Sequence, residues 1–398
     1  MTLDQKNLIK STIPILRTNG IALTKYFYKR MFEHNPELQS VFNMGNQANG
    51  KQQTALAYAV LAYAEHIDNP SVLISALQNI GQKHVSLNIK PEQYQIVGRH
   101  LIASISEVLG TGASNELLDA WTQAYFELAH IMIDLEQQMY NQNLTKNGGW
   151  IGWRAFEIRT IETTSSEIKS FYLYPVDGKP IASFLAGQFI SIQIEIPELN
   201  ILQPRQYSLS SVYHPDYYRI SIKKEYAENA LGMVSNAMHL KQQGDIVLLS
   251  SPMGTFNVDL ENKNPLVLIS GGVGITPLYS MLQANQQNQQ NKTIFIHGCR
   301  NIDVQAFKNE LSQLQLHAPW LQTYFFYENI LGTETNINTF QGRIDLTICK
   351  EAILLENAQY YICGPEQFIT HHYNHLIQLK VNKNQIFFEQ FGPQTIFF

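Results

Sequence analysis

The spacing of apolar residues changes twice along the chain, and these changes limit the folds that it can adopt. Up to about residue 146, apolar side chains recur every three or four positions, as they do over 94–108, which indicates helices. From Trp150 onward apolar and polar residues alternate, which indicates half-buried strands of an antiparallel sheet. After Pro265, continuous apolar runs such as 266–270 indicate strands that are buried on both faces of a parallel sheet.

These changes predict three domains. The chain has 398 residues, which is more than one hydrophobic core usually organises. The segment Lys146-Asn147-Gly148-Gly149 ends the helical pattern, because paired glycines destabilise a helix interior. We therefore expect a multi-domain fold, with an all-α domain over 1–147, an antiparallel β-barrel over 150–260 and an α/β nucleotide-binding domain over 264–398.

Composition and charge exclude several classes of function. A net charge of -5 and a pI near 6.2 speak against a nucleic acid partner, because neutralising phosphates requires clustered Lys and Arg. Cys299, Cys349 and Cys363 form neither a CxxC nor a CxxCH motif, so we expect no disulfide scaffold, zinc ribbon or covalent heme attachment. The start lacks the pattern of a secretory signal and no apolar run is long enough to span a membrane. We expect a cytoplasmic protein without stable membrane association.

His84 is the first candidate for a functional residue. It ends a predicted helix, on the stripe that Leu73, Leu77 and Ile80 trace at helical spacing. A single histidine on an apolar face is more often a packed core residue than a ligand. The residues described next favour the second interpretation, in which His84 is the axial ligand of a heme iron.

A second group of residues suits the opposite, distal side of such an iron. Gln52 and Leu56 lie one turn apart on a predicted helix, Tyr28 lies on the helix before it, and Phe42 lies in a loop between them. Hydrogen bonds from a phenol and an amide favour bound dioxygen over its loss. With His84 the set looks like a globin heme pocket, although a surface tyrosine and a solvated glutamine are the simpler interpretation of Tyr28 or Gln52 alone.

Tyr94 and Glu136 interrupt otherwise apolar helical faces. A buried carboxylate is costly unless it is hydrogen-bonded or paired. If both residues approach His84, Glu136 accepts the second ring N–H, which strengthens the imidazole as an iron ligand and favours the activation of bound oxygen over its storage. The alternative is that Glu136 emerges at a frayed helix end.

The motif Arg205-Gln206-Tyr207-Ser208 lies on an alternating strand, so Arg205 and Tyr207 share a face. A guanidinium there can neutralise a flavin pyrophosphate while the phenol packs on the isoalloxazine. Downstream, Gly232 precedes a short helix whose first amides, together with the Ser235 hydroxyl, suit the same phosphates. The two motifs together indicate an FAD site.

Two strand-to-helix turns in the last domain suit a dinucleotide. The segment Gly271-Gly272-Val273-Gly274-Ile275-Thr276-Pro277 lets a dinucleotide approach the backbone, although it differs from the GxGxxG fingerprint. The turn Cys363-Gly364-Pro365 offers a second approach point for the nicotinamide, unless Cys363 is only a small buried residue.

Two further features close to the C-terminus allow more than one interpretation. Phe391 either covers the flavin or is an exposed aromatic of the tail. His371, His372 and His375 invite a metal site, but no carboxylate or cysteine lies at a useful spacing, so we expect a solvated helix face.

Taken together, these residues resemble the flavohemoglobins over essentially the whole chain. The resemblance rests on the segments 27–32, 34–38, 42–44, 82–84, 90–94, 205–208, 271–277 and 363–365. Members of that family join a globin to a ferredoxin-reductase-like module for FAD and NAD(P), and they act as nitric oxide dioxygenases. The resemblance implies a noncovalent heme b with His84 as proximal ligand. It also implies roles for these residues: Tyr94 and Glu136 support the ligand, Tyr28, Gln52 and Leu56 form the distal pocket, and Phe42 packs on the heme.

The same resemblance implies that Arg205, Tyr207, Ser208 and Ser235 bind FAD, while the 271–277 segment and the Cys363 turn bind NAD(P)H. Two positions depart from the family pattern. Phe189 replaces a common tyrosine, so one hydrogen bond to the flavin is expected to be missing, and Gln390 stands where a cysteine is often found.

This architecture implies a mechanism. A nicotinamide gives up two electrons as hydride whereas a heme iron accepts one at a time, and a flavin converts between the two. We expect NAD(P)H to reduce FAD, FAD to reduce the heme, and nitric oxide and dioxygen to combine there to nitrate. The partners are then small molecules (NO, O2 and NADH or NADPH), and we expect a monomer.

Two alternatives remain open, a heme-based gas sensor and an oxygen-binding globin whose reductase only keeps the iron ferrous. The choice between NADH and NADPH is also open, because Arg300 either meets a 2′-phosphate or is a surface residue.

Overall fold

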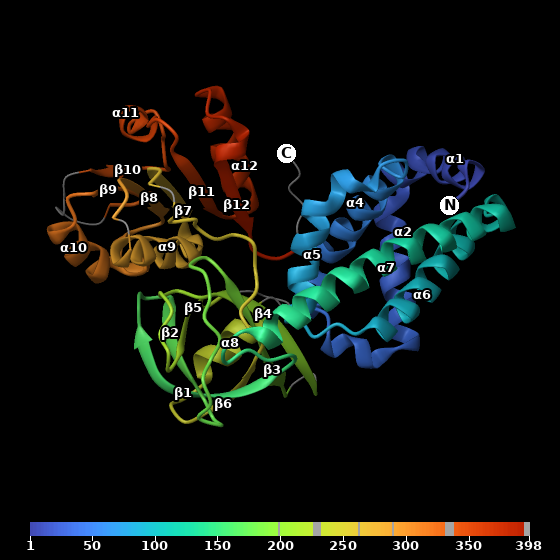
Figure 1. Cartoon of the computed structure of the whole chain (residues 1–398), viewed down its shortest axis with the longest axis horizontal. Helices are drawn as coiled ribbons and strands as arrows, with labels where there is room; N and C mark the ends of the chain where they lie inside the picture. The colour runs from blue at the N-terminus through green and yellow to red at the C-terminus, as the bar shows by residue number, and fades with distance from the viewer. Residues whose placement is uncertain (198–199, 226–231, 262, 289, 331–337, 394–398) are drawn as a thin grey trace.

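The computed structural model describes residues 1–197, 200–225, 232–261, 263–288, 290–330 and 338–393. Helices form the N-terminal part, an antiparallel sheet follows, and a parallel sheet flanked by helices completes the chain (Figure 1). The predicted order of an all-α, an antiparallel β and an α/β part is therefore confirmed. Among the described residues, no helix is long and apolar enough to span a lipid bilayer.

The N-terminal part is a bundle of helices around a core that includes Phe27, Met31, Leu101 and Trp121. Its α-helices are α1 (Leu3–Ser11), α2 (Ile13–His34), α3 (Met44–Ala48), α4 (Lys51–Glu65), α5 (Ile74–Ser86), α6 (Pro91–Leu109) and α7 (Asn115–Thr145). Short 3-10 turns cover η1 (Pro36–Ser40), η2 (Pro70–Leu73) and η3 (Gly110–Gly112). Pro91 occupies the first turn of α6, where a missing N–H costs nothing.

The glycines after α7 are required by close backbone contacts. Gly148 has a φ of 71°, and a Cβ there would lie 2.7 Å from the carbonyl of Pro180. A Cβ on Gly149 would lie 1.8 Å from the carbonyl oxygen of Asn143. The chain therefore leaves the helical part through a turn that side chains would block.

The antiparallel sheet has the strand order β4-β3-β6-β1-β2-β5. Its elements are β1 (Arg154–Thr163), β2 (Ile168–Pro175), β3 (Phe189–Ile196), β4 (Ile201–Ser208), β5 (Tyr218–Lys223), α8 (Met233–Leu240) and β6 (Ile246–Leu249). A bridge between Leu209 and Ile220 joins the two ends of the sheet, which closes it into a barrel around buried aliphatic side chains.

The parallel sheet has the strand order β10-β9-β8-β7-β11-β12. Its strands are β7 (Leu266–Gly271), β8 (Thr293–Cys299), β9 (Leu321–Tyr327), β10 (Thr339–Gln341), β11 (Gln359–Gly364) and β12 (Ile386–Gln390). Its helices and 3-10 turns are η4 (Gly272–Gly274), α9 (Ile275–Gln287), η5 (Ile302–Val304), α10 (Lys308–His317), α11 (Lys350–Ile353), α12 (Glu366–Gln378) and η6 (Lys383–Gln385).

Both faces of this sheet are covered, as its continuous apolar strands predict. Leu268 and Phe295 pack under α9 and α10, whereas Ile269 and Ile296 pack on the side of α12. The β7 turn into α9 and the β11 turn into α12 therefore meet at the carboxyl edge of adjacent strands.

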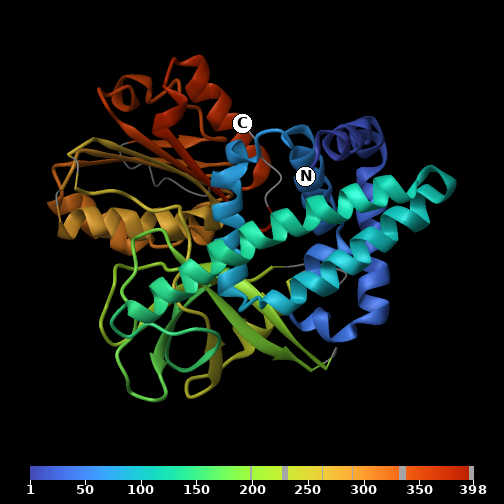
Figure 2. The same ribbon diagram turned by 45° about the vertical axis from the view of Figure 1, so that its right-hand side comes forward.

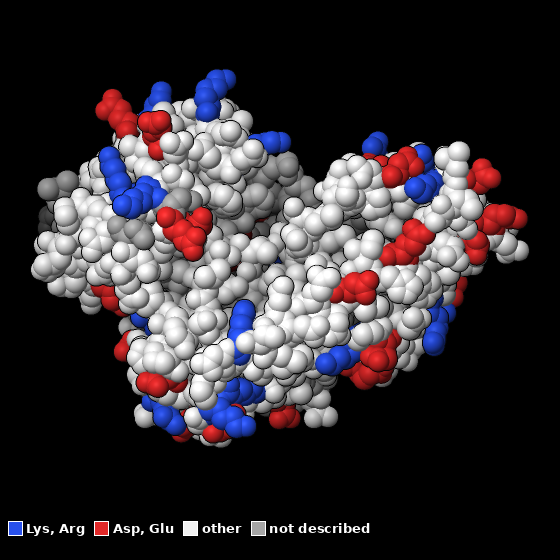
Figure 3. All heavy atoms as spheres, in the orientation of Figure 1, with Lys and Arg blue, Asp and Glu red and all other residues white. Residues whose placement is uncertain are grey.

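The helix α5 lies where the helical bundle meets the barrel, and the end of β12 runs toward it (Figures 1 and 2). In the space-filling view, a hollow separates the upper part of the parallel-sheet domain from the helical bundle (Figure 3). All three parts of the chain thus approach one another beside α5.

Candidate functional site

Three helices bring His84, Tyr94 and Glu136 together. Nδ1 of His84, on α5, lies 2.7 Å from Oε1 of Glu136 on α7 and 3.0 Å from the hydroxyl of Tyr94 on α6. The Tyr94 hydroxyl donates to the same carboxylate oxygen at 2.5 Å. Glu136 is only 3% exposed, so its carboxylate lies inside the bundle rather than at a frayed end.

This arrangement leaves one imidazole nitrogen available. Within the described part of the chain Nε2 of His84 has no hydrogen-bond partner, while Nδ1 faces both Glu136 and Tyr94. Burial and the neighbouring carboxylate raise the pKa of Tyr94, so its phenol stays protonated and donates. An imidazole that is held through Nδ1 is oriented to coordinate a metal through Nε2, and the donor set fits a heme iron.

Several of the residues that were predicted to form the distal pocket also lie together. Tyr28 is 4% exposed, and its ring lies edge-on to Phe42 at a centroid distance of 5.7 Å. Burial raises the pKa of Tyr28, while side-chain hydrogen bonds with Gln52 and Gln47 oppose the rise. Leu56 is half-buried against the same core. Tyr28 is therefore a protonated donor beside Gln52, and Gln47 is a neighbour that the sequence pattern did not reveal.

The strand β4 carries a half-buried cation, Arg205, for which the described residues show no carboxylate partner. Burial lowers the pKa of Arg205 to about 10, and Nη1 of its guanidinium donates to the Pro204 carbonyl at 2.7 Å. In the described residues no carboxylate pairs with Arg205. Tyr207 lies two positions after Arg205, on the same face of β4, and burial raises the pKa of its phenol. A half-buried guanidinium without a carboxylate partner among the described residues fits the pyrophosphate of a flavin dinucleotide.

The other predicted flavin residues lie nearby but use their side chains within the protein. Nε2 of Gln206 donates to the Ser191 hydroxyl at 3.0 Å. Ser208 is 6% exposed. The Ser235 hydroxyl donates to the carbonyl of Gly232 at 2.9 Å, and Gly232 has a φ of 81° before α8.

The sequence predicted Phe189 beside the flavin, and the structure places it among apolar side chains of two domains. It is 5% exposed and belongs to an apolar cluster with Val85, Met139 and Met253. The ring therefore packs at the junction between the helical bundle and the barrel.

The two glycine-containing turns of the parallel sheet touch each other. A Cβ on Gly274 would lie 2.2 Å from the carbonyl oxygen of Cys363 and 2.7 Å from the amide nitrogen of Gly364. Gly272 has a φ of 54°, and a Cβ there would meet nothing within 4 Å. The turn therefore has an open side that a dinucleotide backbone can approach, and its φ favours glycine.

The other residues that were predicted to bind the nucleotide or to cover the flavin differ in their exposure to solvent. Val273 is half-buried, Thr276 donates from its hydroxyl to the Val273 carbonyl at 3.1 Å, and Pro277 is buried in α9. Burial raises the pKa of Cys363, which is 0% exposed. Pro365 precedes α12 as its N-cap residue. Phe391 is 42% exposed.

The prediction for the three histidines of α12 is wrong in one respect. His371 is exposed and His375 half-buried, but His372 is 3% exposed and packs on Phe368 at a centroid distance of 4.4 Å. Burial lowers its pKa to about 3. Throughout the described ranges, no three His, Cys, Asp or Glu side chains are grouped to hold a metal ion.

A second face of α5 contacts residues of the barrel and of the segment that follows it. Gln82 accepts from the amide of Gly254 at 2.8 Å, and Ser86 accepts from the Ser191 hydroxyl at 2.7 Å. Asn79 accepts from the hydroxyl of Thr255 at 2.5 Å. These three residues are spaced by three and four positions, so they share one side of the helix that carries His84.

Lys83 completes this contact. Its ammonium donates to the carbonyl of Gly392 at 2.6 Å and lies close enough to Glu389 to oppose the effect of burial. Burial raises the pKa of Glu389 and lowers the pKa of Lys83, and attraction between the two acts against both changes. The tail after β12 is thus tied to the residue that precedes His84.

The comparisons with known proteins agree with this arrangement. A globin family model matches residues 25–132, and a model of the oxidoreductase NAD-binding domain matches residues 268–373. A flavohemoprotein of Bordetella pertussis is 44% identical over 391 residues, which cover 97% of each chain. This chain belongs to the flavohemoprotein family. The flavohemoprotein of Bacillus subtilis is 41% identical over 398 residues and 98% of each chain.

Solved structures extend the likeness of this flavohemoprotein to its fold. The crystal structure of the flavohemoglobin from Malassezia yamatoensis, with bound FAD and heme, matches with a TM-score of 0.86 and 25% identity. That match covers 98% of this chain and 99% of the other. The FAD/NAD-binding domain of a nitric oxide dioxygenase from Vibrio cholerae matches 60% of this chain and 99% of its own, with a TM-score of 0.54 and 32% identity.

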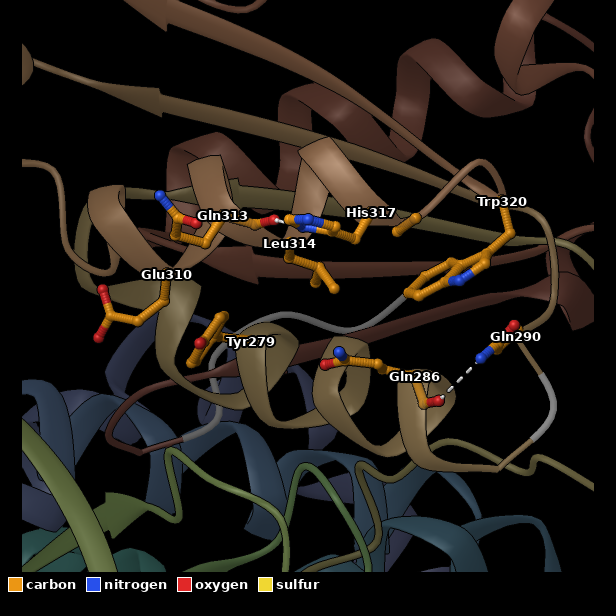
Figure 4. Close-up of a pocket in the computed structure, with 9 residues that line it drawn as sticks. Tyr279, Gln286, Gln290, Glu310, Gln313, Leu314, His317 and Trp320 are labelled. Carbon is orange, nitrogen blue, oxygen red and sulfur yellow. Dashed lines mark hydrogen bonds between the residues drawn. The ribbon is translucent and has the colours of Figure 1, made fainter.

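A pocket of this flavohemoprotein lies away from the residues described above. It has a volume of about 360 Å³ between α9 and α10, with Tyr279 at one end and Trp320 at the other (Figure 4). Glutamine side chains and His317 line its walls. It contains none of the predicted site residues.

Proposed function

We propose that the chain is a nitric oxide dioxygenase, which converts NO and O2 to nitrate at a heme b that NAD(P)H re-reduces through FAD. Membership of the flavohemoprotein family supports this proposal, as does the name of the matched Vibrio cholerae domain. The single observation that carries it is the 2.7 Å contact between Oε1 of Glu136 and Nδ1 of His84.

That contact bears on the choice between catalysis and storage. A carboxylate on Nδ1 increases the electron density that the imidazole donates through Nε2. Such donation favours the activation of bound oxygen over its reversible carriage. We assign the proximal role to His84, with Tyr94 and Glu136 as its supports.

The distal residues would handle the ligand. Tyr28 carries a protonated hydroxyl beside Gln52, so the pair can donate hydrogen bonds to an oxygen ligand. Leu56 and Phe42 supply apolar walls. The heme itself, when bound, supplies the metal at which NO and O2 combine.

The reductase residues would bind the electron donors. Arg205 and Tyr207 are assigned to FAD, with Gly232, Ser235, Gln206 and Ser208 around it. The turns 271–277 and 363–365 are assigned to NAD(P)H, and Phe391 and Phe189 to the surroundings of the flavin. We keep 1–147, 150–260 and 264–398 as the proposed ranges of the three domains.

The test compares the holoprotein with His84→Ala and Arg30→Gln. Arg30 forms a salt bridge with Glu107 elsewhere in the helical domain, at 3.1 Å, so its variant serves as the control. Each protein receives NADH, O2 and NO, and nitrate is measured over time. We expect nitrate formation in the wild type and in the control, and loss of it in His84→Ala. Equal nitrate formation in all three would contradict the proposal.

A further inference from the structure

A continuous chain of hydrogen bonds joins the flavin-binding strand to the helix that carries His84. Nε2 of Gln206 donates to Oγ of Ser191 at 3.0 Å. Oγ of Ser191 donates to Oγ of Ser86 at 2.7 Å, and Oγ of Ser86 donates to the carbonyl of Lys83 at 2.7 Å. Every hydroxyl in this chain both accepts and donates, so each bond polarises the next.

The two serines at its centre are buried. Ser191 is 0% and Ser86 is 1% exposed. The backbone of Ser191 is fixed as well, because its amide donates to the Ser250 hydroxyl at 2.8 Å and its carbonyl accepts from the Ser250 amide at 2.9 Å. Sliding of the two domains would break the bond between the two hydroxyls where water does not replace it, and the free-energy cost of that loss resists sliding.

The two ends of this hydrogen-bond chain lie beside the residues assigned to FAD and to the heme. Gln206 is the cross-strand neighbour of Ser191 and lies between Arg205 and Tyr207 in sequence. At the other end, Lys83 is bonded to His84 in the backbone. The chain therefore spans from the strand assigned to FAD to the helix assigned to the heme.

Apolar packing alone would not fix this alignment. The surrounding cluster of Val85, Phe189 and Met253 is non-directional, and apolar surfaces can slide with little change in buried area. A hydrogen bond between two buried hydroxyls requires one distance and one angle.

We infer that Ser191 and Ser86 are positioning residues for electron transfer from FAD to the heme, because their bond is fully buried, whereas the bonds of Gln82 and Asn79 that hold the barrel against the same face of α5 are part-buried and exposed. The inference rests on the proposed function. When bound, FAD would take a hydride with its two electrons from NADH, which leaves as NAD+, and would supply them singly to ferric iron, so that each electron reduces one iron to the ferrous state.

The experiment mixes the holoprotein with NADH in the absence of O2 and records flavin reduction and heme reduction separately. We expect Ser191→Ala to slow heme reduction by about five- to twentyfold, the factor that loss of one buried hydrogen bond imposes on a docking equilibrium. Flavin reduction should stay within about twofold, since the dinucleotide turns are untouched.

The matched control is Ser170→Ala. Ser170 is 1% exposed and bonds the Ser221 hydroxyl at 2.7 Å, inside the same barrel and away from α5. It should leave both rates near those of the wild type. If it slows heme reduction as much as Ser191→Ala, or if Ser191→Ala changes nothing, the inference is wrong.

Two further measurements keep the inference open to test. Hydrogen exchange of the amides at the end of α5 should become faster in Ser191→Ala and not in Ser170→Ala, whatever the activity. If Ser191→Ala does not fold, the double variant Ser86→Ala/Ser191→Ala takes its place, because removal of both hydroxyls leaves neither serine with a broken bond. This double variant should still reduce the heme slowly. Absence of heme reduction in the wild type would contradict the proposed function, whereas normal reduction in the variants would contradict only the role of the serines.

Discussion

The carboxylate of Glu136 lies 2.7 Å from Nδ1 of His84, although the two residues are 52 positions apart in the chain. The contact fixes the orientation of the imidazole ring from the side of α7. The opposite side of α5 binds the barrel through Gln82 and Ser86. One helix thus carries His84, to which we assign the proximal role, and contacts the barrel.

Glu136→Gln should weaken the electron donation that this contact provides. The amide keeps the size of the side chain but carries no charge, and loss of such a partner typically costs ten- to a hundredfold in activity. We expect nitrate formation to fall by about that factor and the iron–histidine stretching frequency to decrease. Glu107→Gln, at an exposed carboxylate paired with Arg30, should change neither quantity.

Tyr28→Phe should accelerate the release of dioxygen. The phenol is buried and protonated, so its removal costs one hydrogen bond to the ligand, which corresponds to about a tenfold change in affinity. Flash photolysis or rapid mixing measures the dissociation rate. Because burial raises the pKa of Tyr28, the effect should not vary between pH 6 and 9; a variant with unchanged oxygen release would remove Tyr28 from the distal site.

Glu389→Gln should change how stability depends on pH. Burial raises the pKa of Glu389 from 4.5 to about 7, which means that the folded state favours the protonated carboxyl. The protonated carboxyl therefore stabilises the folded state fully below pH 4.5, and this stabilisation is lost as the pH rises through 7. Between pH 5 and 8, the free energy of unfolding of the wild type should therefore fall by about 1 kcal/mol relative to that of Glu389→Gln, as measured by thermal unfolding. Parallel curves for the two proteins would contradict this assignment.

Arg219→Gln should slow the reduction of the flavin by NADH. Arg219 is 7% exposed, and its guanidinium lies 5.5 Å from the ring of Tyr279 and 5.1 Å from that of Phe307. These contacts tie the barrel to the nucleotide-binding domain, and loss of a desolvated cation–π contact costs about 2 kcal/mol. We expect a severalfold higher KM for NADH and slower flavin reduction.

The control for Arg219 is Arg159→Gln. Arg159 lies over the ring of Tyr174 at 4.7 Å, within the barrel itself. Its variant should leave flavin reduction unchanged. Equal effects of the two variants would mean that Arg219 only stabilises the barrel.

Periodicity predicted the order of the folds. For the meeting of His84 with Tyr94 and Glu136 it left a frayed helix end as the alternative, and only the resemblance to the flavohemoglobins implied the contact. All three side chains lie on helical faces, and a polar residue on an apolar face needs a partner inside the bundle. The residues that join the domains gave no such signal. Ser86 and Ser191 are 105 positions apart, and each reads as an ordinary small polar residue in its own segment.

Other contacts could not be predicted from the sequence for related reasons. The neighbour of Lys83 is Glu389, and nothing in a single sequence pairs residues of different domains. His372 is buried because α12 packs against the parallel sheet, a fact that helical spacing alone does not reveal. Phe189 packs at the junction with the helical bundle, which depends on how the domains dock.

The most direct test of the account is an anaerobic mixing experiment with NADH at several protein concentrations. We expect the flavin band to bleach first and the ferric heme to become ferrous afterwards, at a rate that does not depend on protein concentration. That result requires electrons to pass within one chain from the flavin to the heme, for which we propose His84 as the iron ligand. Reduced flavin beside a heme that stays ferric, or a heme reduction rate that rises with protein concentration, would contradict it.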